Sequence, residues 1–371
     1  MLSVRMFVSH LRKCVLFLSV IIFFCISCTQ KNSTIPPGEL DINSSIQPVP
    51  ESAKFIDDSL YIWGGSLVQS HNDKKYHLFY SQWPRKYGFS AWVTHSEIAH
   101  AVSDSPFGPY KFKNVALPSR GKGYWDGMVT HNPTVHYFNG KYYLYYMGNI
   151  GDGVITGSGL NWVHRNNQRI GVAVADDPNG PWQRADTPLI DVSPDSTDLD
   201  ALMTSNPSVT QMPDGRFLMI YKGVAKQREM PFGGPVMLLT AIADSPTGPF
   251  VKQMKPVFTA PGFDFPAEDP YVWYGDNCYY AILSKKKGAF TEAGRSMVLF
   301  YSLDGAEWKL AKNPLVSNLE IKWENGTVQK LIALERPQLL FLDGKPIALL
   351  CAANETPEHS FNVQIPLNIK Q

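Results

Sequence analysis

Acidic residues stand next to prolines at two places in the second half of the chain. The sequence reads Glu-Asp-Pro at 268–270 and Glu-Arg-Pro at 335–337. Two carboxyl groups that flank a glycosidic bond can hydrolyse it, because one protonates the leaving oxygen while the other activates water. Glu268, Asp269 and Glu335 are therefore candidate catalytic residues. Adjacent strand residues point to opposite faces, so we expect at most one of Glu268 and Asp269 to serve this chemistry.

Asp126 and His131 extend this set to the first half of the chain. Asp126 lies in the sequence Tyr-Trp-Asp-Gly at 124–127 and is a candidate base, although a carboxylate ahead of a glycine is also common in turns. His131 is a candidate acid near neutral pH, with a buried, hydrogen-bonded core histidine as the alternative.

A repeat indicates which elements carry these residues. His-Asn-Pro, Ser-Asn-Pro, Glu-Asp-Pro and Glu-Arg-Pro occur at 131–133, 205–207, 268–270 and 335–337, and an alternating apolar stretch follows each. Proline is tolerated at the first position of a strand, so each triplet is predicted to begin one. A second motif, Asp-x-Pro-x-Gly-Pro-aromatic, occurs at 104–110, 176–182 and 244–250, with a degenerate copy at 302–308. It suits a tight turn between two outer strands.

These motifs define five units, of which the first, around Trp63, lacks the proline. Four-stranded units repeated at this spacing, with no helical period, are typical of propeller blades. The sequence therefore predicts an all-β fold, a five-bladed β-propeller, over residues 51–371. A last strand at 360–366 is expected to close the ring against the N-terminal blade.

The topology gathers polar and aromatic residues on one face of the propeller. Strands of a blade alternate in direction, so each inner strand begins on the face where the second strand connects to the third. Four of these connections are long, at 82–94, 148–168, 223–235 and 285–294, and long loops are commonly functional. The candidate substrate-binding residues on this face are Trp63, Trp83, His95, Trp125, Asn132, Asn206, Lys222, Arg228 and Arg336.

The types of these residues indicate a carbohydrate ligand. The aromatic residues suit stacking on sugar rings, with ordinary core packing as the alternative. The basic residues suit an anionic sugar, either a uronate or a sulfated one, or they only balance the carboxylates.

The strand starts and the turn motif resemble the five-bladed glycosidases of glycoside hydrolase families 43, 32 and 117, from about residue 55 onward. The resemblance implies that acidic residues at inner-strand starts act as base, pKa modulator and acid. Asp269 matches the Asp-Pro position of those families, while Glu268 and Glu335 match the Glu-x-Pro position.

The chain departs from this pattern in three blades. Gly64-Gly65 stands where family 43 has its base, and Asn132 and Asn206 stand at the next two strand starts. Family 117 uses a histidine as acid, which implies a role for His131 or His95.

These features predict an exo-acting glycoside hydrolase that inverts the anomeric carbon by direct attack of water. Two alternatives stay open. One is a glycoside phosphorylase, in which the basic residues bind phosphate. The other is a non-catalytic glycan-binding lipoprotein, since the fold does not decide activity.

The N-terminus is predicted to export and anchor the protein. Arg5, Arg12 and Lys13 precede an apolar run at 14–26 that ends in Cys-Ile-Ser-Cys and resembles a bacterial lipobox. Residues 1–28 are predicted to be a lipoprotein signal peptide with Cys28 lipidated, and a plain secretory signal is the alternative. Residues 29–50 are polar and proline-containing and are predicted to be a flexible tether. We therefore expect a protein outside the cytoplasm that touches a bacterial membrane only through its lipid.

Composition excludes other classes of protein. The chain has 34 Lys and Arg against 33 Asp and Glu, so it lacks the basic excess of a nucleic-acid-binding protein. No glycine-rich nucleotide motif follows a predicted strand, so we expect no cofactor. The architecture allows a structural Ca²⁺ in the central channel, for which spacing indicates no ligand set. Cys278 and Cys351 are predicted to be free buried thiols, because the repeat places them too far apart to pair.

Overall fold

The computed structural model describes residues 35–157 and 159–369. The predicted signal peptide of residues 1–28, the lipidation of Cys28 and the start of the predicted tether lie outside these residues. In the described part of the chain, no helix is long and apolar enough to span a bilayer.

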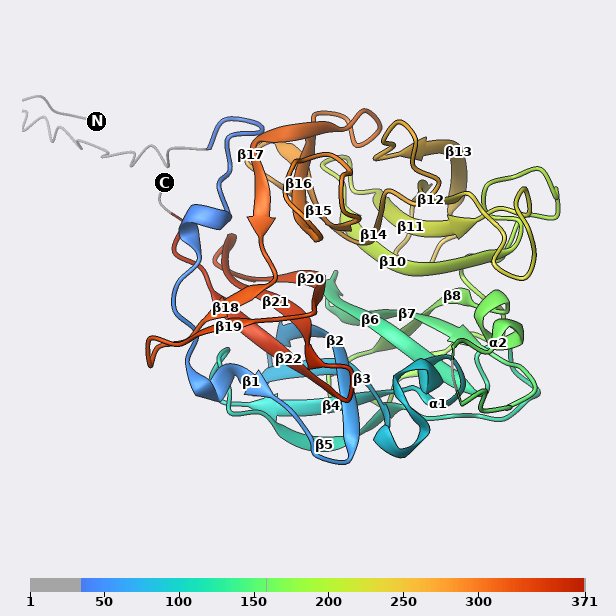
Figure 1. Ribbon diagram of the computed structural model, residues 1–371, viewed down its shortest axis with the longest axis horizontal. Helices are drawn as coiled ribbons and strands as arrows, with labels where there is room; N and C mark the ends of the chain where they lie inside the picture. The colour runs from blue at the N-terminus through green and yellow to red at the C-terminus, as the bar shows by residue number, and fades with distance from the viewer. Residues whose placement is uncertain (1–34, 158, 370–371) are drawn as a thin grey trace, which may run out of the picture. The chain divides into compact units, whose positions relative to one another are not determined.

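The described residues form five antiparallel four-stranded sheets whose inner strands meet around a common axis (Figure 1). Blade 1 consists of β2 (Leu60–Gln69), β3 (Tyr76–Pro84), β4 (Glu97–Ser103) and β5 (Lys111–Leu117). Blade 2 consists of β6 (Val129–Phe138), β7 (Lys141–Asn149), β8 (Arg169–Ala175) and β9 (Gln183–Arg184). Blade 3 consists of β10 (Met203–Gln211), β11 (Phe217–Val224), β12 (Val236–Ala243) and β13 (Val251–Val257). Blade 4 consists of β14 (Ala267–Gly275), β15 (Cys278–Lys285), β16 (Ser296–Ser302) and β17 (Lys309–Ser317). Blade 5 consists of β20 (Ala333–Leu342), β21 (Lys345–Thr356), β22 (His359–Pro366) and β1 (Lys54–Phe55).

The remaining elements are small. A hairpin of β18 (Glu320–Lys322) and β19 (Val328–Lys330) precedes blade 5, while α1 (Trp92–His95) and α2 (Trp162–Asn166) lie in the long loops of blades 1 and 2. The predicted all-β, five-bladed β-propeller is confirmed. Cys278 and Cys351 are free and buried, as expected.

Blade 5 closes the ring with a strand from the N-terminal part of the described chain. Lys54 and Phe55 of β1 pair with Val363 and Asn362 of β22. The predicted closing strand at 360–366 is therefore present as part of β22. Its partners are β21 and β1, so the closure is made within blade 5 and not against a strand of blade 1.

Residues 35–50 pack against the propeller. Leu40, Ile42 and Val49 are buried in one cluster with side chains of blades 4 and 5. The backbone N–H of Val49 donates to the carbonyl of Lys322 at 2.8 Å. The prediction of a flexible tether is thus wrong from residue 35 onward, because a few spaced apolar side chains hold an otherwise polar segment in place.

Each inner strand has the same irregularity near its start. The pairing register with the second strand shifts there in all five blades. One residue of each inner strand adopts a left-handed conformation, with φ between 52° and 59°, in a ring of Gly64, Asn132, Asn206, Asp269 and Arg336. We call these five residues the axial ring. The residues immediately before them, which we call the first layer, are Trp63, His131, Ser205, Glu268 and Glu335.

Candidate active site

Glu268 of the first layer lies at the start of β14, between two lysines. Its carboxylate accepts hydrogen bonds from Lys222 of β11 at 3.3 Å and from Lys286 at 2.5 Å, and 18% of its side chain is exposed. Burial by itself would raise the pKa of Glu268, but the two ammonium groups outweigh it and hold the pKa at about 2. Glu268 is therefore an accessible carboxylate that stays ionised at neutral pH, as a general base must be.

Glu335 holds the equivalent place in blade 5. Its carboxylate forms an ion pair with Arg295, which ends the loop between β15 and β16. The side chain of Glu335 is 13% exposed, whereas that of Arg295 is 43% exposed. Arg295 is therefore the more exposed partner of this ion pair.

His131 of the first layer lies beneath the loop between β3 and β4. Its Nδ1 is 2.7 Å from Ser96 Oγ, and its ring stacks on Trp92 with the centroids 4.7 Å apart. Burial, together with the positive charges of Arg336 and Lys222, holds the pKa of His131 well below its ordinary value. His131 is therefore neutral here, and it can reach a ligand only if the loop that carries Trp92 moves.

The axial ring is a connected hydrogen-bond chain beneath the first layer. Asn132 Nδ2 donates to Asn206 Oδ1 at 2.9 Å, and Asn206 Nδ2 donates to Asp269 Oδ1 at 2.6 Å. Arg336 Nη1 donates to the same oxygen at 3.4 Å. All four side chains are buried. The structure places these four residues in a buried network that joins blades 2 to 5 at the axis, and the catalytic role of Asp269 and the substrate-binding roles of Asn132, Asn206 and Arg336 stay predictions.

Gly64 completes the ring from blade 1. A Cβ atom at this position would lie 3.2 Å from Asn132 Oδ1 and 3.5 Å from Arg336 Nε. Side chains of blades 2 and 5 thus occupy the space that a blade 1 side chain would fill. This contact is a physical reason for glycine at the position where the family resemblance implies an acid.

Asp126 is an interior carboxylate of blade 2 and not the candidate base that the sequence indicated. It is fully buried and accepts hydrogen bonds from Tyr146 Oη at 2.6 Å, Arg120 Nε at 2.7 Å and Arg184 Nη1 at 3.4 Å. Blade 3 repeats the arrangement, because the buried Asp200 accepts from a tyrosine of β11 at 2.9 Å and a lysine of β13 at 2.7 Å. Asp126 uses three of its about four acceptor sites and is fully buried, so water does not reach it, whereas Asp200 Oδ1 has no partner among the described residues.

Of the three tryptophans predicted as sugar platforms, Trp63 and Trp83 are buried, whereas Trp125 is half-buried and lines a separate pocket beside blade 2. Trp83 is 1% exposed and Trp63 is 7% exposed, and the ring of Phe89 lies against both, with centroids 5.4 and 5.3 Å away. Trp125 stacks on Tyr146 of blade 2 with the centroids 5.7 Å apart. Only Trp63 belongs to the first layer, and there it forms part of the wall.

Arg228 and His95 lie in the loops that surround the first layer. Arg228 forms two hydrogen bonds to Asp264, at 2.7 and 3.1 Å, and its side chain is 54% exposed. His95 is half-buried, with Nδ1 2.8 Å from Thr94 Oγ1. Burial, aided by Lys86, lowers the pKa of His95. Of the predicted basic ligands, Lys222 is the one that contacts an accessible carboxylate of the first layer.

Sequence reasoning missed Lys286, Trp92 and two hydroxyls. Ser205 of the first layer and Ser284, the cross-strand neighbour of Glu268, have buried hydroxyls with no partner among residues 35–157 and 159–369. Unpaired hydroxyls beside an accessible carboxylate can bind the hydroxyl groups of a sugar. The run of three lysines at 285–287 in a long connection was the available signal for Lys286.

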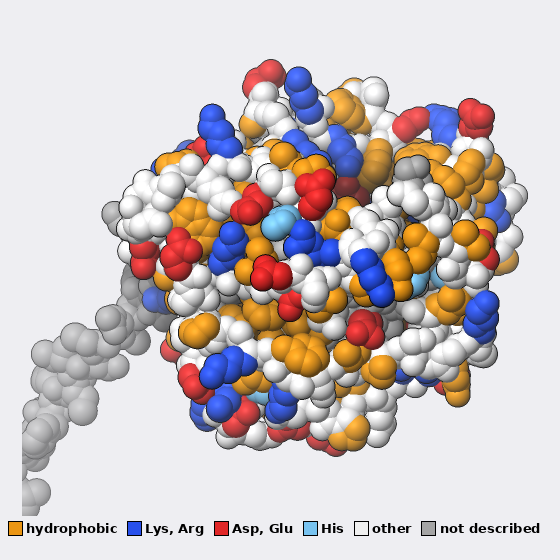
Figure 2. Space-filling view, turned by 60° about the horizontal axis from the view of Figure 1, so that its bottom comes forward, with side chains coloured by type: hydrophobic (Ala, Val, Ile, Leu, Met, Phe, Trp, Pro, Cys, Tyr) orange, Lys and Arg blue, Asp and Glu red, His pale blue; other side chains and the backbone are white. Residues whose placement is uncertain are grey.

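Positive charge exceeds negative charge around Glu268. Arg165 of α2 is buried, which lowers its pKa to about 10, and the negative charge of Glu268 opposes this shift. The basic residues near the two glutamates and the axial ring are Lys222, Lys286, Arg165, Arg295 and Arg336, and the acidic ones are Glu268, Asp269 and Glu335. Figure 2 shows one face of the molecule, on which basic and acidic side chains are interspersed.

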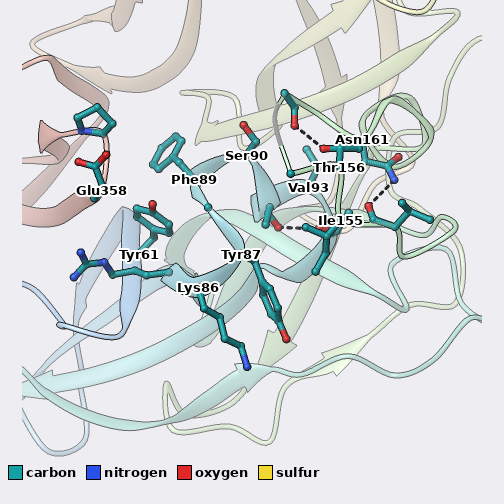
Figure 3. Close-up of a pocket in the computed structure, with 18 residues that line it drawn as sticks. Tyr61, Lys86, Tyr87, Phe89, Ser90, Val93, Ile155, Thr156, Asn161 and Glu358 are labelled. Atoms are coloured by element: carbon teal, nitrogen blue, oxygen red, sulfur yellow. Dashed lines mark hydrogen bonds between the residues drawn. The ribbon is translucent and has the colours of Figure 1, made fainter.

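A pocket of about 460 Å³ adjoins the first layer on the same side of the propeller. In Figure 3, Tyr61, Phe89 and Glu358 line one side of it, while Thr156 and Asn161 line the other. Its walls come from the β3–β4 loop, the β7–β8 loop and the short turn between β21 and β22. Because Phe89 also packs on Trp63, this pocket and the first layer share a wall.

Solved structures of several glycosidases share this fold. One is Zg3597, a family 117 glycoside hydrolase produced by the marine bacterium Zobellia galactanivorans, at 16% identity and a TM-score of 0.58, with 88% of this chain and 91% of that chain covered. The endo-arabinase from Bacteroides thetaiotaomicron VPI-5482 is 12% identical with a TM-score of 0.54, covering 87% and 98%. An exo-1,5-alpha-L-arabinanase from a bovine ruminal metagenomic library is 13% identical with a TM-score of 0.54, covering 88% and 97%.

Sequence comparison extends this likeness beyond the fold. No curated protein sequence matches the chain. The family model described as the glycosyl hydrolases family 32 N-terminal domain matches residues 132–364. The match begins in β6 and runs into β22, so it includes Glu268 and Glu335 and leaves out blade 1, where Gly64 replaces the expected acid. The chain belongs to the family of the glycosyl hydrolases family 32 N-terminal domain and is a glycoside hydrolase.

Proposed function

We propose that the protein is an exo-acting, inverting glycoside hydrolase whose reaction takes place at the first layer, between Glu268 and Glu335. One observation carries this proposal. The two glutamates occupy equivalent positions of adjacent blades, and each is partly exposed and held by a basic side chain. The other first-layer residues are Trp, His and Ser, so the layer is asymmetric, as a single site requires.

Glu268 is the base in this proposal, because Lys222 and Lys286 keep it ionised. Glu335 is the acid and protonates the leaving oxygen after the substrate has drawn Arg295 away. Inversion requires the two carboxyl groups to be separated by roughly 6.5–9.5 Å, which leaves room for the attacking water. His131 is the second candidate acid, since a substrate anion that offsets Lys222 and Arg336 would favour its protonation.

The excess of basic residues supports an anionic sugar as substrate. Five basic residues lie with three carboxylates at the centre. Two of these carboxylates already have basic partners, since Asp269 pairs with Arg336 of the axial ring and Glu268 pairs with two lysines. A uronate or a sulfate group would satisfy the remaining positive charge and could form charge-assisted hydrogen bonds with Arg295.

The unequal lengths of the loops around the first layer support exo action. Long loops surround the first layer in blades 1 to 4, whereas β21 and β22 of blade 5 are joined by only Pro357 and Glu358. The pocket of Figure 3 lies at this low part of the wall. We propose that the terminal sugar enters the first layer and that the rest of the chain leaves across this pocket.

Three measurements on a panel of neutral, uronate-containing and sulfated oligosaccharides test the proposal. NMR of the first-formed product should show the inverted anomer, and a retained anomer would refute the inverting mechanism. E335Q should keep turnover of aryl glycosides whose leaving group needs no proton, whereas E268Q should lose turnover of all substrates. Equal turnover of neutral and anionic oligosaccharides would refute the anionic preference.

A glycoside phosphorylase is the second candidate function, favoured by the same basic residues. In that case inorganic phosphate would take the place of water beside Lys222 and Lys286. Turnover that rises with phosphate concentration and yields a sugar phosphate would identify the phosphorylase, and turnover independent of phosphate would exclude it.

We also propose that the enzyme is exported and attached to a bacterial membrane through a lipid on Cys28. The lipobox-like sequence at 25–28 supports this location. Labelling cells with a fatty-acid analogue should modify the wild-type protein and not C28A. Equal labelling of both would contradict the anchor.

A further inference from the structure

We infer that Lys285 is a positioning residue that sets the charge state of both glutamates by holding the loop of residues 286–295. The inference rests on the proposed function for its catalytic consequence and on the contacts of the Lys285 side chain for its geometry. Lys285 is the last residue of β15, and the loop that follows it carries a cation at each end. Lys286 contacts Glu268, and Arg295 contacts Glu335.

The ammonium group of Lys285 binds backbone carbonyls and not a carboxylate. Its Nζ donates to the carbonyl of Ala293 at 2.6 Å and of Gly294 at 2.9 Å, with the carbonyl of Thr291 at 3.3 Å. The residue is 1% exposed, and burial lowers the pKa of its ammonium group. A buried cation is costly unless it is fully bonded, so these carbonyls and Lys285 must stay together.

This bonding explains how a loop with few apolar residues keeps one conformation. Apart from Lys285, its inner anchors are Ala289, which is fully buried, and Phe290, whose ring contacts Phe300 edge-on at 5.0 Å. Lys285 holds the opposite end, next to Arg295. Without the ammonium group, the carbonyls of Thr291 and Ala293 would lose this donor and that of Gly294 would keep only Ser296 Oγ, so the loop would open to recover bonds with water.

Opening of the loop would change the two glutamates together. Lys286 supplies one of the two ammonium groups that offset the burial of Glu268, so its departure would raise the pKa of that carboxyl. Arg295 would leave Glu335 at the same time. If the pKa of Glu268 rises, the enzyme loses activity at a higher pH as the medium is acidified. This shift of the acid limb distinguishes a positioning role of Lys285 from a loss of the fold.

The test is K285M, which keeps the length of the side chain and removes its charge. K287M is the matched control, because Lys287 is an exposed lysine of the same loop. Hydrogen exchange of residues 286–295 should become at least tenfold faster in K285M and stay unchanged in K287M. The acid limb of kcat/KM against pH should move to higher pH by at least one unit in K285M alone.

Each readout can fail separately. Unchanged exchange in the loop of a folded K285M would overturn the inference, whatever happens to activity. A mobile loop with an unmoved acid limb would overturn the positioning role of Lys285. If E268Q is as active as the wild type while the loop of K285M becomes mobile, the proposed function fails, and with it the catalytic part of this inference.

Discussion

The first layer and the axial ring are one residue apart in every blade, and in blades 4 and 5 these neighbours differ in exposure and bonding. Glu268 keeps 18% of its side chain exposed and is bonded to flexible lysines. Its neighbour Asp269 is buried and bonded to Asn206 and Arg336 across the axis. The difference teaches that, at a propeller axis, the register of a single bulge decides which of two adjacent acids can meet a ligand.

The largest expected effect separates Glu268 from acids of the surrounding loops. E268Q removes the proposed base and should lower kcat by a factor on the order of 10²–10⁴, the usual contribution of general acid–base catalysis. E229Q, a change in the exposed β11–β12 loop, should leave kcat within about twofold. Steady-state rates of both variants at matched thermal stability provide the test, and a comparable loss in both would remove the distinction.

The next effect concerns the ring rather than the reaction. D269N leaves the buried Arg336 without its counter-ion and should destabilise the fold by about 3–5 kcal/mol. D264N breaks the exposed pair with Arg228 and should destabilise the fold far less than D269N does. Denaturant unfolding measures both variants. Equal and small losses would mean that the axial ring does not hold the blades together.

A third comparison uses pH, because the interior and the site titrate in different ranges. Burial lowers the pKa of His136 to about 4 and, with His77 adding, that of His100 to about 3. In the unfolded chain these groups bind protons near pH 6.5, so the unfolding free energy should fall as pH drops below 6.5. His136 alone should account for about 3 kcal/mol at pH 4, by 1.36 kcal/mol per pKa unit.

The site should not share this sensitivity. Glu268, with a pKa of about 2, keeps its charge throughout this range. The melting temperature should therefore fall between pH 6.5 and pH 4.5, while kcat/KM per folded molecule loses less than half its value to protonation of the base. An acid limb above pH 4.5 would contradict the charge state assigned to Glu268.

The smallest expected effect concerns Arg228, in the loop between β11 and β12. R228A removes an exposed side chain whose partner is Asp264, so the unfolding free energy should change little. KM for an anionic oligosaccharide should rise more than KM for a neutral one. Unchanged KM values for both would place the anionic contacts at Lys222, Lys286 and Arg295 alone.

The fold was predictable because its motifs are local and repeated. Proline triplets and glycine-containing turns mark strand starts and blade edges without reference to distant residues. The first layer was partly predictable for the same reason, since Glu268, Glu335 and His131 stand at fixed offsets from those motifs. Residues 35–50 were not, because three apolar side chains gave no compositional signal of burial.

The hydrogen-bond partners of individual side chains were beyond the reach of the sequence. Asp126 has the type and position of a base, and only the approach of Tyr146, Arg120 and Arg184 shows that its oxygens are already bonded. Asp269 likewise matched an acidic position of the family, but the bulge in β14 directs its side chain toward the axial ring. The bonding of Lys285 to loop carbonyls depends on a backbone conformation that no spacing encodes.

Rescue of E268A by azide tests the central claim most directly. The variant removes the carboxylate and leaves space for a small anionic nucleophile between Lys222 and Lys286. On an aryl glycoside that the wild type hydrolyses, we predict that E268A is inactive and that azide restores turnover with formation of a glycosyl azide of inverted configuration. Turnover of E268A at the wild-type rate without azide would contradict the assignment of Glu268 as the base of this enzyme.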